Sequence, residues 1–451
     1  MLIYVIALSQ FASAFMFGGV AVTLPAMGAE LAAGAVALGL VDTLYMGASA
    51  ALLLPAGKLA DATDKNTLFK AGLLLFAVSS LAIGFMPSIW TIISLRLVQG
   101  AASALMIATG MAILTDHAPP GRRGQAYGIS IGAIYLALGT GPLIAGLITQ
   151  HFGWRWVYIA SFAPLAASYV LVHVFLKGRW RPPSAPLDVL GSTVIAASVM
   201  ALIFGSAFLS LSPFAYGLIA LGVALAIAFF ALAEKSANPL VDLREVRANR
   251  TFTNALMIQF LLYSAALSTS FLFSIYLQAV RGFGAETAGL ILVVGPALMA
   301  LIAPVSGRLA DRYPPDLLAG SGVCCVFAST VLATRIEADT GLAYVLAILI
   351  AQGVGYALFS SPNMAIVMSS VTRDKTSVAS ALAAKMRSLG MVFSMIVVMV
   401  ILSFQIGSDA VVDRKSEFVT VMAVSYVVFS IVTAIGVWLA FRERILRRSG
   451  A

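Results

Sequence analysis

Two short stretches decide the fold: Gly57-Lys58-Leu59-Ala60-Asp61 and Gly307-Arg308-Leu309-Ala310-Asp311, the second followed by Arg312. Each stretch comes directly after a long apolar run, and the two copies lie 250 residues apart. A membrane-length run that ends in Gly, a basic residue and Asp, and that occurs once in each half, is typical of transporters built from two related halves.

The composition is that of an integral membrane protein. Of 451 residues, 61% are hydrophobic and 10% are charged, whereas roughly 25% of residues are charged in an ordinary soluble domain. The apolar runs are long enough to cross the hydrocarbon layer as helices. Because alternating barrel-strand patterning is absent, and only helices or closed barrels satisfy the backbone in lipid, we expect an all-α membrane protein.

Apolar runs bounded by Gly, Pro and charged loops predict fourteen membrane-spanning helices. Their approximate ranges are 2–26, 35–57, 68–86, 89–114, 125–149, 155–176, 188–210, 213–233, 252–279, 286–306, 316–334, 342–369, 378–404 and 417–441. With a cytoplasmic N-terminus, twenty of the 28 Lys and Arg residues fall in inner loops or the tail and five in outer loops. This bias predicts a multi-pass protein of the cell inner (plasma) membrane with both termini cytoplasmic.

The repeat also predicts how the chain is divided. If the helix before Gly307 corresponds to the helix before Gly57, residues 1–176 form an N-terminal six-helix bundle and residues 251–451 form a second bundle with a basic tail. Residues 177–250 are then an inserted pair, spans 7 and 8, with flanking cytoplasmic segments. We therefore expect two pseudo-symmetric six-helix bundles plus two inserted helices.

Several classes of function are not indicated. The net charge of +9 comes from basic residues in short loops, so the chain has no contiguous basic face for nucleic acid. No nucleotide-binding Gly-rich loop is present, and no cluster of His, Cys or carboxylates lies within the spans, so we expect no ATPase, enzyme, metal or cofactor other than the proton gradient. Cys324 and Cys325 are adjacent in an apolar run and are interpreted as packing residues.

Further blocks resemble the major facilitator superfamily, and in particular its 14-span drug:proton antiporter branch. The blocks cover nearly the whole chain in the order typical of that branch. They are Leu95-Arg96-Leu97-Val98-Gln99-Gly100, Gly139-Thr140-Gly141-Pro142 with Gly146, Trp154-Arg155-Trp156-Val157, Tyr276-Leu277-Gln278 to Gly282-Phe283 with Ala288-Gly289, Ser361-Pro362-Asn363, and Ser380 through Arg387 to Gly390.

The resemblance implies two groups of conformational residues. Cytoplasmic gating is assigned to the repeated stretches, at Gly57, Asp61, Gly307, Asp311 and Arg312. A hinge in span 5, where small residues and a proline permit close approach and a kink, is assigned to Gly139, Gly141, Pro142 and Gly146. The alternatives are solvated charges in a turn for the aspartates and ordinary small-residue helix packing for span 5.

Proton coupling is predicted at Asp42 and Arg96. Many relatives carry an acid in span 1 before an Ala-Leu-Pro turn, but residues 15–22 before Thr23-Leu24-Pro25 contain no carboxylate. Asp42 is the one acid clearly inside an apolar run and is the candidate proton carrier. Arg96 must face a partner, because an intramembrane guanidinium is costly, and the resemblance implies a role in proton handling. Alternatively, Asp42 stays hydrated near the outer interface and Arg96 is purely structural.

Lys385 and Arg387, near the start of span 13, could simply extend to the membrane interface. The scarcity of intramembrane acids favours monovalent, neutral, zwitterionic or amphiphilic substrates over divalent cations. A central cavity could bind them through contact area and a few hydrogen bonds. Its candidate lining residues are Tyr45, Gln259, Tyr263, Gln278 and Asn363.

We therefore expect a monomeric secondary transporter that exports small lipophilic or amphiphilic compounds by alternating access in exchange for protons, as in multidrug efflux. Two alternatives stay open at this point. One is a lipid or lipid-linked molecule translocator of the same fold, which also suits an apolar cavity. The other is a non-transporting membrane sensor, which the missing span 1 acid would suit.

Overall fold

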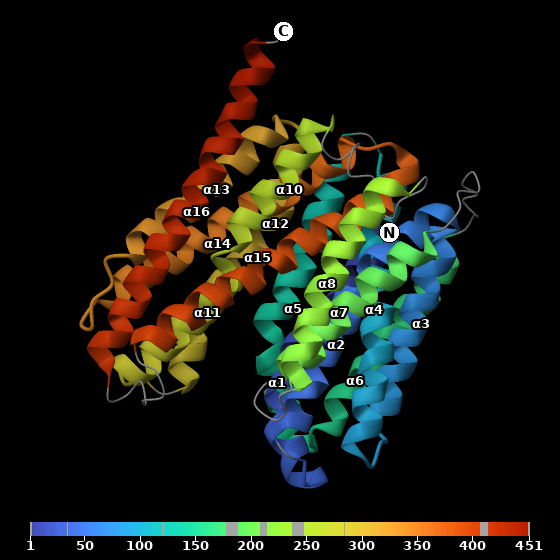
Figure 1. The fold of residues 1–451 in the computed structure, drawn as a ribbon, viewed down its shortest axis with the longest axis horizontal. Helices are drawn as coiled ribbons and strands as arrows, with labels where there is room; N and C mark the ends of the chain where they lie inside the picture. The colour runs from blue at the N-terminus through green and yellow to red at the C-terminus, as the bar shows by residue number, and fades with distance from the viewer. Residues whose placement is uncertain are drawn as a thin grey trace. The chain divides into compact units, whose positions relative to one another are not determined.

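The computed structural model describes residues 2–33, 35–119, 121–176, 188–207, 214–236, 248–283, 285–405 and 414–449. Within these ranges the regular elements are all helices (Figure 1). The predicted all-α class is therefore confirmed. Of the predicted segments that flank the inserted pair, 177–187 and 234–250, residues 177–187 and 237–247 lie outside the described residues.

The helices follow the predicted apolar runs closely. The first part of the chain forms α1 (Leu2–Leu31), α2 (Ala35–Ala62), α3 (Lys65–Ile83), α4 (Ile89–His117), α5 (Arg123–Phe152), α6 (Arg155–Phe175), α7 (Val189–Ala207) and α8 (Phe214–Lys235). The remainder forms α10 (Arg250–Tyr263), α11 (Ala266–Ile275) with the π-helix η1 (Tyr276–Val280), α12 (Ala285–Ala310), α13 (Pro315–Ala333), α14 (Leu342–Ser369), the short 3-10 helix η2 (Arg373–Lys375), α15 (Thr376–Gln405) and α16 (Lys415–Ser449).

Twelve helical segments of the described chain are long and apolar enough to cross a membrane. Helices α10, α11 and η1 together count as one of them, Arg250–Val280, whereas α7 and α15 are not among the twelve. The predicted number of fourteen spans is thus not established by this criterion. Side-chain caps mark some helix starts: the carboxylate of Asp64 accepts a hydrogen bond from the Asn66 backbone N–H at 3.2 Å where α3 begins.

The chain forms two compact units. The first unit contains Met1–Ala118, Leu136–Arg250 and Val371–Lys385. Within it, α2 packs along α4, α3 contacts both α4 and α6, and α1 packs on α6. Helices α7 and α8 lie side by side, with α7 against α2 (Figure 1).

The second unit contains Pro119–Tyr135, Thr251–Ser370 and Met386–Ala451. Within it, α14 packs against α12 and α13, and α13 packs against α16. Its main hydrophobic cluster includes Phe273, Tyr276, Phe418 and Tyr426, all almost fully buried. The unit boundaries fall within two helices, since α5 divides after Tyr135 and α15 divides after Lys385.

Candidate functional site

The last residue of the first repeated stretch contacts the N-terminus of a helix that lies far away in the sequence. Asp61, at the end of α2, accepts hydrogen bonds from the backbone N–H groups of Ser377 at 2.9 Å and Val378 at 2.8 Å. These N–H groups belong to the first turn of α15 and have no partner within that helix. The carboxylate therefore satisfies two orphan donors at the positive end of the helix dipole. We call this arrangement the first capping site.

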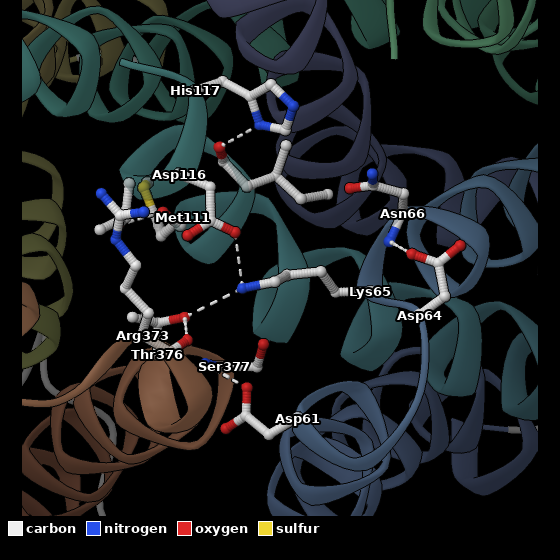
Figure 2. Close-up of polar contacts among 12 residues, drawn as sticks. Asp61, Asp64, Lys65, Asn66, Met111, Asp116, His117, Arg373, Thr376 and Ser377 are labelled. Carbon is white, nitrogen blue, oxygen red and sulfur yellow. Dashed lines mark hydrogen bonds and ion pairs between the residues drawn. The ribbon is translucent and has the colours of Figure 1, made fainter. Parts of the chain in front are cut away.

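An ion pair supports the first capping site. Lys65, at the start of α3, is fully buried and contacts the carboxylate of Asp116, at the end of α4, at 2.7 Å. Its Nζ also donates a hydrogen bond to Thr376 Oγ1 at 3.3 Å, the residue directly before Ser377 (Figure 2). Figure 2 shows the Lys65 side chain between Asp116 and Thr376. The lysine thus links the ends of α3 and α4 to the start of α15.

Gly57 lies one helical turn before Asp61 and faces the same part of α15. A Cβ atom at this glycine would lie 3.0 Å from the Ser377 carbonyl oxygen and 3.0 Å from the Ala381 Cβ. Both distances are tighter than ordinary van der Waals contact, so a larger residue would push α15 outward. Gly57 permits the approach that brings Asp61 within hydrogen-bonding distance of the helix start.

The second copy builds the same contact in the second unit. Asp311, next to the end of α12, accepts hydrogen bonds from the backbone N–H groups of Gly124 at 2.7 Å and Gln125 at 2.9 Å. These groups belong to the first turn of α5, so Asp311 again satisfies orphan donors at a helix N-terminus. We call this arrangement the second capping site.

Beside Asp311, a glycine of α12 packs against two glycines of α5. A Cβ atom at Gly307 would collide with the backbone carbonyl group of Gly124 and lie 3.0 Å from the Cα of Gly128. Arg312, by contrast, is exposed, and its side chain makes no hydrogen bond or ion pair with the described part of the chain. The structure therefore brings Gly307 and Asp311 together at α5 but not Arg312.

Arg96 has the partner that its position requires. Its Nη2 contacts Asp42 Oδ1 at 2.7 Å, its Nη1 donates to Gln99 Oε1 at 2.7 Å, and its Nε donates to the Val41 carbonyl oxygen at 3.0 Å. The Arg96 side chain is fully buried, whereas that of Asp42 is 28% exposed. The guanidinium also lies 4.2 Å from the centroid of the Tyr45 ring, a cation–π contact.

The small residues of span 5 lie in the second part of α5 and face α1. The Cβ of Ala145 lies 3.0 Å from the position of a Cβ at Gly19, and the Cγ1 of Val22 lies 3.6 Å from a Cβ at Gly146. Helices α1 and α5 therefore approach closely here. Gly139, Gly141 and Pro142 lie within the same helix, and the hinge assigned to these residues stays a prediction.

Three of the five expected cavity residues meet in the second unit. Asn363 Nδ2 donates to Gln259 Oε1 at 2.8 Å, one turn away from Tyr263 on α10. The Tyr263 hydroxyl lies 2.6 Å from the Tyr135 hydroxyl and 3.0 Å from Ser360 Oγ. The others lie elsewhere: Gln278 bonds to Ser274 within its own helix, and Tyr45 belongs to the first unit.

Sequence reasoning missed Lys65, Asp116, Thr376 and Ser360. A weak signal exists for the ion pair, because Lys65 and Asp116 are charged residues at the ends of apolar runs, which favours pairing near an interface. No signal identifies Thr376 or Ser360, since a hydroxyl residue beside a helix start or within a span is common. Among the residues that the structure describes, no group of three or more His, Cys, Asp or Glu residues could hold a metal ion.

Comparisons with known proteins give a consistent result. The family model of the Major Facilitator Superfamily matches residues 6–395. The riboflavin transporter RibZ of Clostridioides difficile (strain 630) is 27% identical over 77% of this chain and 76% of its own length. The tetracenomycin C resistance and export protein of Streptomyces glaucescens is 28% identical over 88% of this chain and 74% of its own length.

A third relative is the multidrug resistance protein Stp of Mycobacterium tuberculosis (strain ATCC 25618 / H37Rv), which is 25% identical over 82% of this chain and 69% of its own length. Among solved structures, the human organic anion transporter MFSD10 (TETRAN) aligns with a TM-score of 0.70 at 14% identity, over 97% of this chain and 98% of that chain. At this identity the structural likeness shows the fold alone.

Proposed function

Because the chain belongs to the Major Facilitator Superfamily, we propose that it is a secondary transporter that exports small lipophilic or amphiphilic compounds in exchange for protons. Proteins of this family are transporters and not enzymes, and they bind small molecules within the membrane. The family resemblance of the repeated stretches is thereby confirmed. The fourteen-span branch, the substrate and the proton coupling belong to the proposal.

The observation that carries the proposal is the pair of capping sites. In each, a carboxylate holds two backbone N–H groups at a helix start. Hydrogen bonds to a charged group are worth about 1.5–3 kcal/mol each, so one site is worth a few kcal/mol. Two states of a switching protein differ by free energies of this size. The two sites can therefore hold one state and release it when substrate or proton binding favours the other.

In the proposed cycle, the capping sites lie on the cytoplasmic side. Both form when the cytoplasmic side is closed, and both separate when it opens. Gly57 and Gly307 allow the close approach, and Gly139, Gly141, Pro142 and Gly146 give α5 the freedom to bend. The termini are cytoplasmic, the protein works as a monomer in the inner membrane, and Arg312 keeps its predicted gating role.

Asp42 is the proposed proton carrier and Arg96 the residue that responds to it. The partial exposure of Asp42 gives water access to the carboxylate, whereas Arg96 is fully buried. Protonation of Asp42 would leave the Arg96 guanidinium with Gln99 and Val41 as neutral partners. A buried charge without a counter-ion is strongly destabilising. Uptake of a proton would therefore favour rearrangement of α2 against α4, which is the coupling that an antiporter needs.

The substrate class is supported by the relatives and by the composition of the second unit. The relatives named above transport riboflavin, export tetracenomycin C or confer multidrug resistance. Gln259, Tyr263 and Asn363 offer hydrogen-bonding groups among apolar and aromatic side chains, as ligand sites for such compounds do. Tyr45 and Gln278 stay predictions, since they lie apart from that group.

The test is transport in proteoliposomes that contain a fluorescent pH indicator. The panel comprises ethidium, riboflavin and a fluorescent phospholipid analogue, and the proteins are the wild type, Asp42→Asn and Glu417→Gln. Glu417 is the matched control, because it is a carboxylate in an exposed pair with Arg414 outside both sites. We expect compound-dependent proton flux in the wild type and in Glu417→Gln, and a loss of at least about tenfold in Asp42→Asn.

Each of the other possible results shows which part of the proposal is wrong. Proton flux that persists in Asp42→Asn would remove Asp42 as the carrier while leaving export intact. Movement of the phospholipid analogue alone would favour a lipid translocator. No movement of any compound would overturn the transport proposal and favour a non-transporting membrane sensor.

A further inference from the structure

Three hydroxyl groups form a closed triangle inside the second unit. Tyr135 from α5, Tyr263 from α10 and Ser360 from α14 are all buried. The Tyr135 hydroxyl lies 2.6 Å from that of Tyr263 and 2.7 Å from Ser360 Oγ, and the third side of the triangle measures 3.0 Å. Ser360 Oγ donates its one proton to the Tyr356 carbonyl oxygen at 2.7 Å, so it serves as an acceptor within the triangle. The two tyrosine hydroxyls can each donate or accept, and they can therefore turn a proton toward a hydrogen-bond acceptor that enters beside them.

Arg387 on α15 belongs to the same unit as the triangle. Its positive charge acts on the Tyr135 hydroxyl. The Arg387 side chain is half-buried and makes no hydrogen bond or ion pair with the described part of the chain. A guanidinium offers five donors in a fixed geometry that matches carboxylates. An arginine in a predicted spanning helix, with none of these donors used by the described part of the chain, can accept a partner from outside the chain.

The position of Arg387 within α15 bears on what it contacts. Helix α15 begins at Thr376, so Arg387 lies about 16 Å along the helix axis at about 1.5 Å per residue. If α15 spans the membrane, as its sequence predicts, a cation this far into the helix faces the interior of a bundle or a water-filled cavity.

Among the side chains of the second unit that the structure describes, no carboxylate forms an ion pair with Arg387. The acidic side chains of this unit that the structure describes lie at helix ends or in connecting segments. They are Asp311, Asp316, Glu337, Asp339 and Glu417. Among them, Asp311 already caps the start of α5. Among the described side chains the charge of Arg387 is therefore left unbalanced, which suits an anionic ligand.

We propose that Arg387, together with the hydroxyl groups of Tyr135 and Tyr263, binds an anionic oxygen of the transported compound. The ligand class is a small aromatic or amphiphilic molecule that carries a carboxylate or a phenolate. The guanidinium offsets the ligand charge, and the hydroxyls donate to the same oxygens. The neighbouring amides of Gln259 and Asn363 contact the uncharged part. This inference rests on the proposed function and specifies its substrate.

The test compares two dyes of the same ring system in proteoliposomes of the full chain. Fluorescein is anionic and the methyl ester of rhodamine is cationic. We expect the wild type to prefer fluorescein, and Arg387→Gln to lower its kcat/KM by at least about tenfold, the size expected for a lost charge-assisted hydrogen bond. The rate for the rhodamine ester should change by less than about twofold, because the ester has no anionic oxygen for the guanidinium to bind.

Two further variants separate binding from folding. Arg387→Lys keeps the charge but not the planar donor geometry, so it should retain part of the preference. Tyr263→Phe removes one hydroxyl from the triangle and keeps the ring, and should weaken fluorescein transport by about threefold. Arg335→Gln is the control, since Arg335 is exposed between α13 and α14. All variants must elute as one species and unfold at the wild-type temperature within a few degrees.

Failure of this inference and failure of the export proposal are distinguishable. Equal transport of both dyes, transport of the rhodamine ester alone, or unchanged fluorescein transport in Arg387→Gln would overturn the anion site and leave export standing. If neither dye nor any compound of the earlier panel moves, the export proposal itself fails, and the anion site fails with it.

Discussion

The two capping sites share one backbone arrangement and differ in everything around it. In both, an aspartate at a helix end accepts two N–H hydrogen bonds from the first turn of another helix. The first site adds a buried ion pair, Lys65 with Asp116. At the corresponding position, four residues after Asp311, the second copy has Pro315, the first residue of α13, and no cation can reach the site from there.

The helix that receives the carboxylate differs as well. The first donor and the residue one turn after it are Ser377 and Ala381 in the first site and Gly124 and Gly128 in the second. Gly57 therefore meets the Ala381 Cβ as well as the α15 backbone, whereas Gly307 meets only backbone atoms and approaches them more closely. Both copies of the motif thus have the carboxylate and its two backbone donors. Their surroundings differ, because the first copy adds an ion pair and the second adds a tighter fit between glycines.

The largest expected effect comes from steric fit. In Gly307→Ala the new Cβ would collide with the Gly124 carbonyl group, which belongs to a helix backbone. Overpacking of this kind costs roughly 1–3 kcal/mol, so transport should fall by about thirtyfold. In Gly57→Ala the nearest atoms lie at 3.0 Å, and a small shift should limit the loss to about threefold. The measurement is the initial transport rate in proteoliposomes.

Gly217→Ala is the control for both glycine variants, since no atom lies within 4 Å of a Cβ at that position in α8. Equal losses for Gly57→Ala and Gly307→Ala would contradict the expected difference between the two capping sites. They would mean that both sites depend on steric fit to the same degree.

An intermediate effect is expected from the ion pair of the first site. Lys65→Met leaves the Asp116 carboxylate, 18% exposed, without its counter-ion. Removal of one partner of a buried pair costs 3–5 kcal/mol, and the partial exposure of Asp116 reduces this to about 1–3 kcal/mol. The double variant Lys65→Met with Asp116→Leu should recover at least half of the loss, as measured by thermal unfolding in detergent.

A double-mutant cycle over these variants gives the coupling energy of the pair directly. A double variant that is no more stable than Lys65→Met would show that Lys65 acts through Thr376 instead of Asp116. The electrostatic character of the first site would then rest on the hydrogen bond to α15.

The smallest effect is expected at Arg312. Because its side chain is exposed and makes no hydrogen bond or ion pair with the described chain, Arg312→Gln should change the transport rate by less than about twofold, as exposed charges contribute little. A loss above about fivefold would show that Arg312 finds a partner in another state of the cycle. It would also restore the gating role predicted from the sequence.

The fold could be predicted from the sequence because its determinants are local. Long apolar runs define the helices, and the order of short motifs defines the family. The number of spans stays a prediction, because the twelve helices that are long and apolar enough to cross a membrane are counted among the described residues alone, and α7 and α15 are not among them.

The candidate residues could be picked out singly from the sequence, but the groups that they contact could not. Asp61, Asp311, Asp42 and Arg96 are conspicuous because each is a charge at or within an apolar run. The donors to Asp61 and Asp311 are backbone N–H groups, which every residue except proline carries, so no residue type marks them. The hydroxyl triangle joins α5, α10 and α14, and a tyrosine in an apolar run does not reveal which helix it will meet.

The two capping sites can form at different stages of synthesis, because their partners lie at different distances in the sequence. Asp311 meets residues made 187 positions earlier, so its helix start is already in the membrane when the carboxylate arrives. Asp61 must wait for a helix start 316 positions later. During that interval Lys65 and Asp116, both in the first third of the chain, have already been made and are able to pair. The ion pair peculiar to the first copy can thus keep the loop after α2 in order while the ribosome completes the protein.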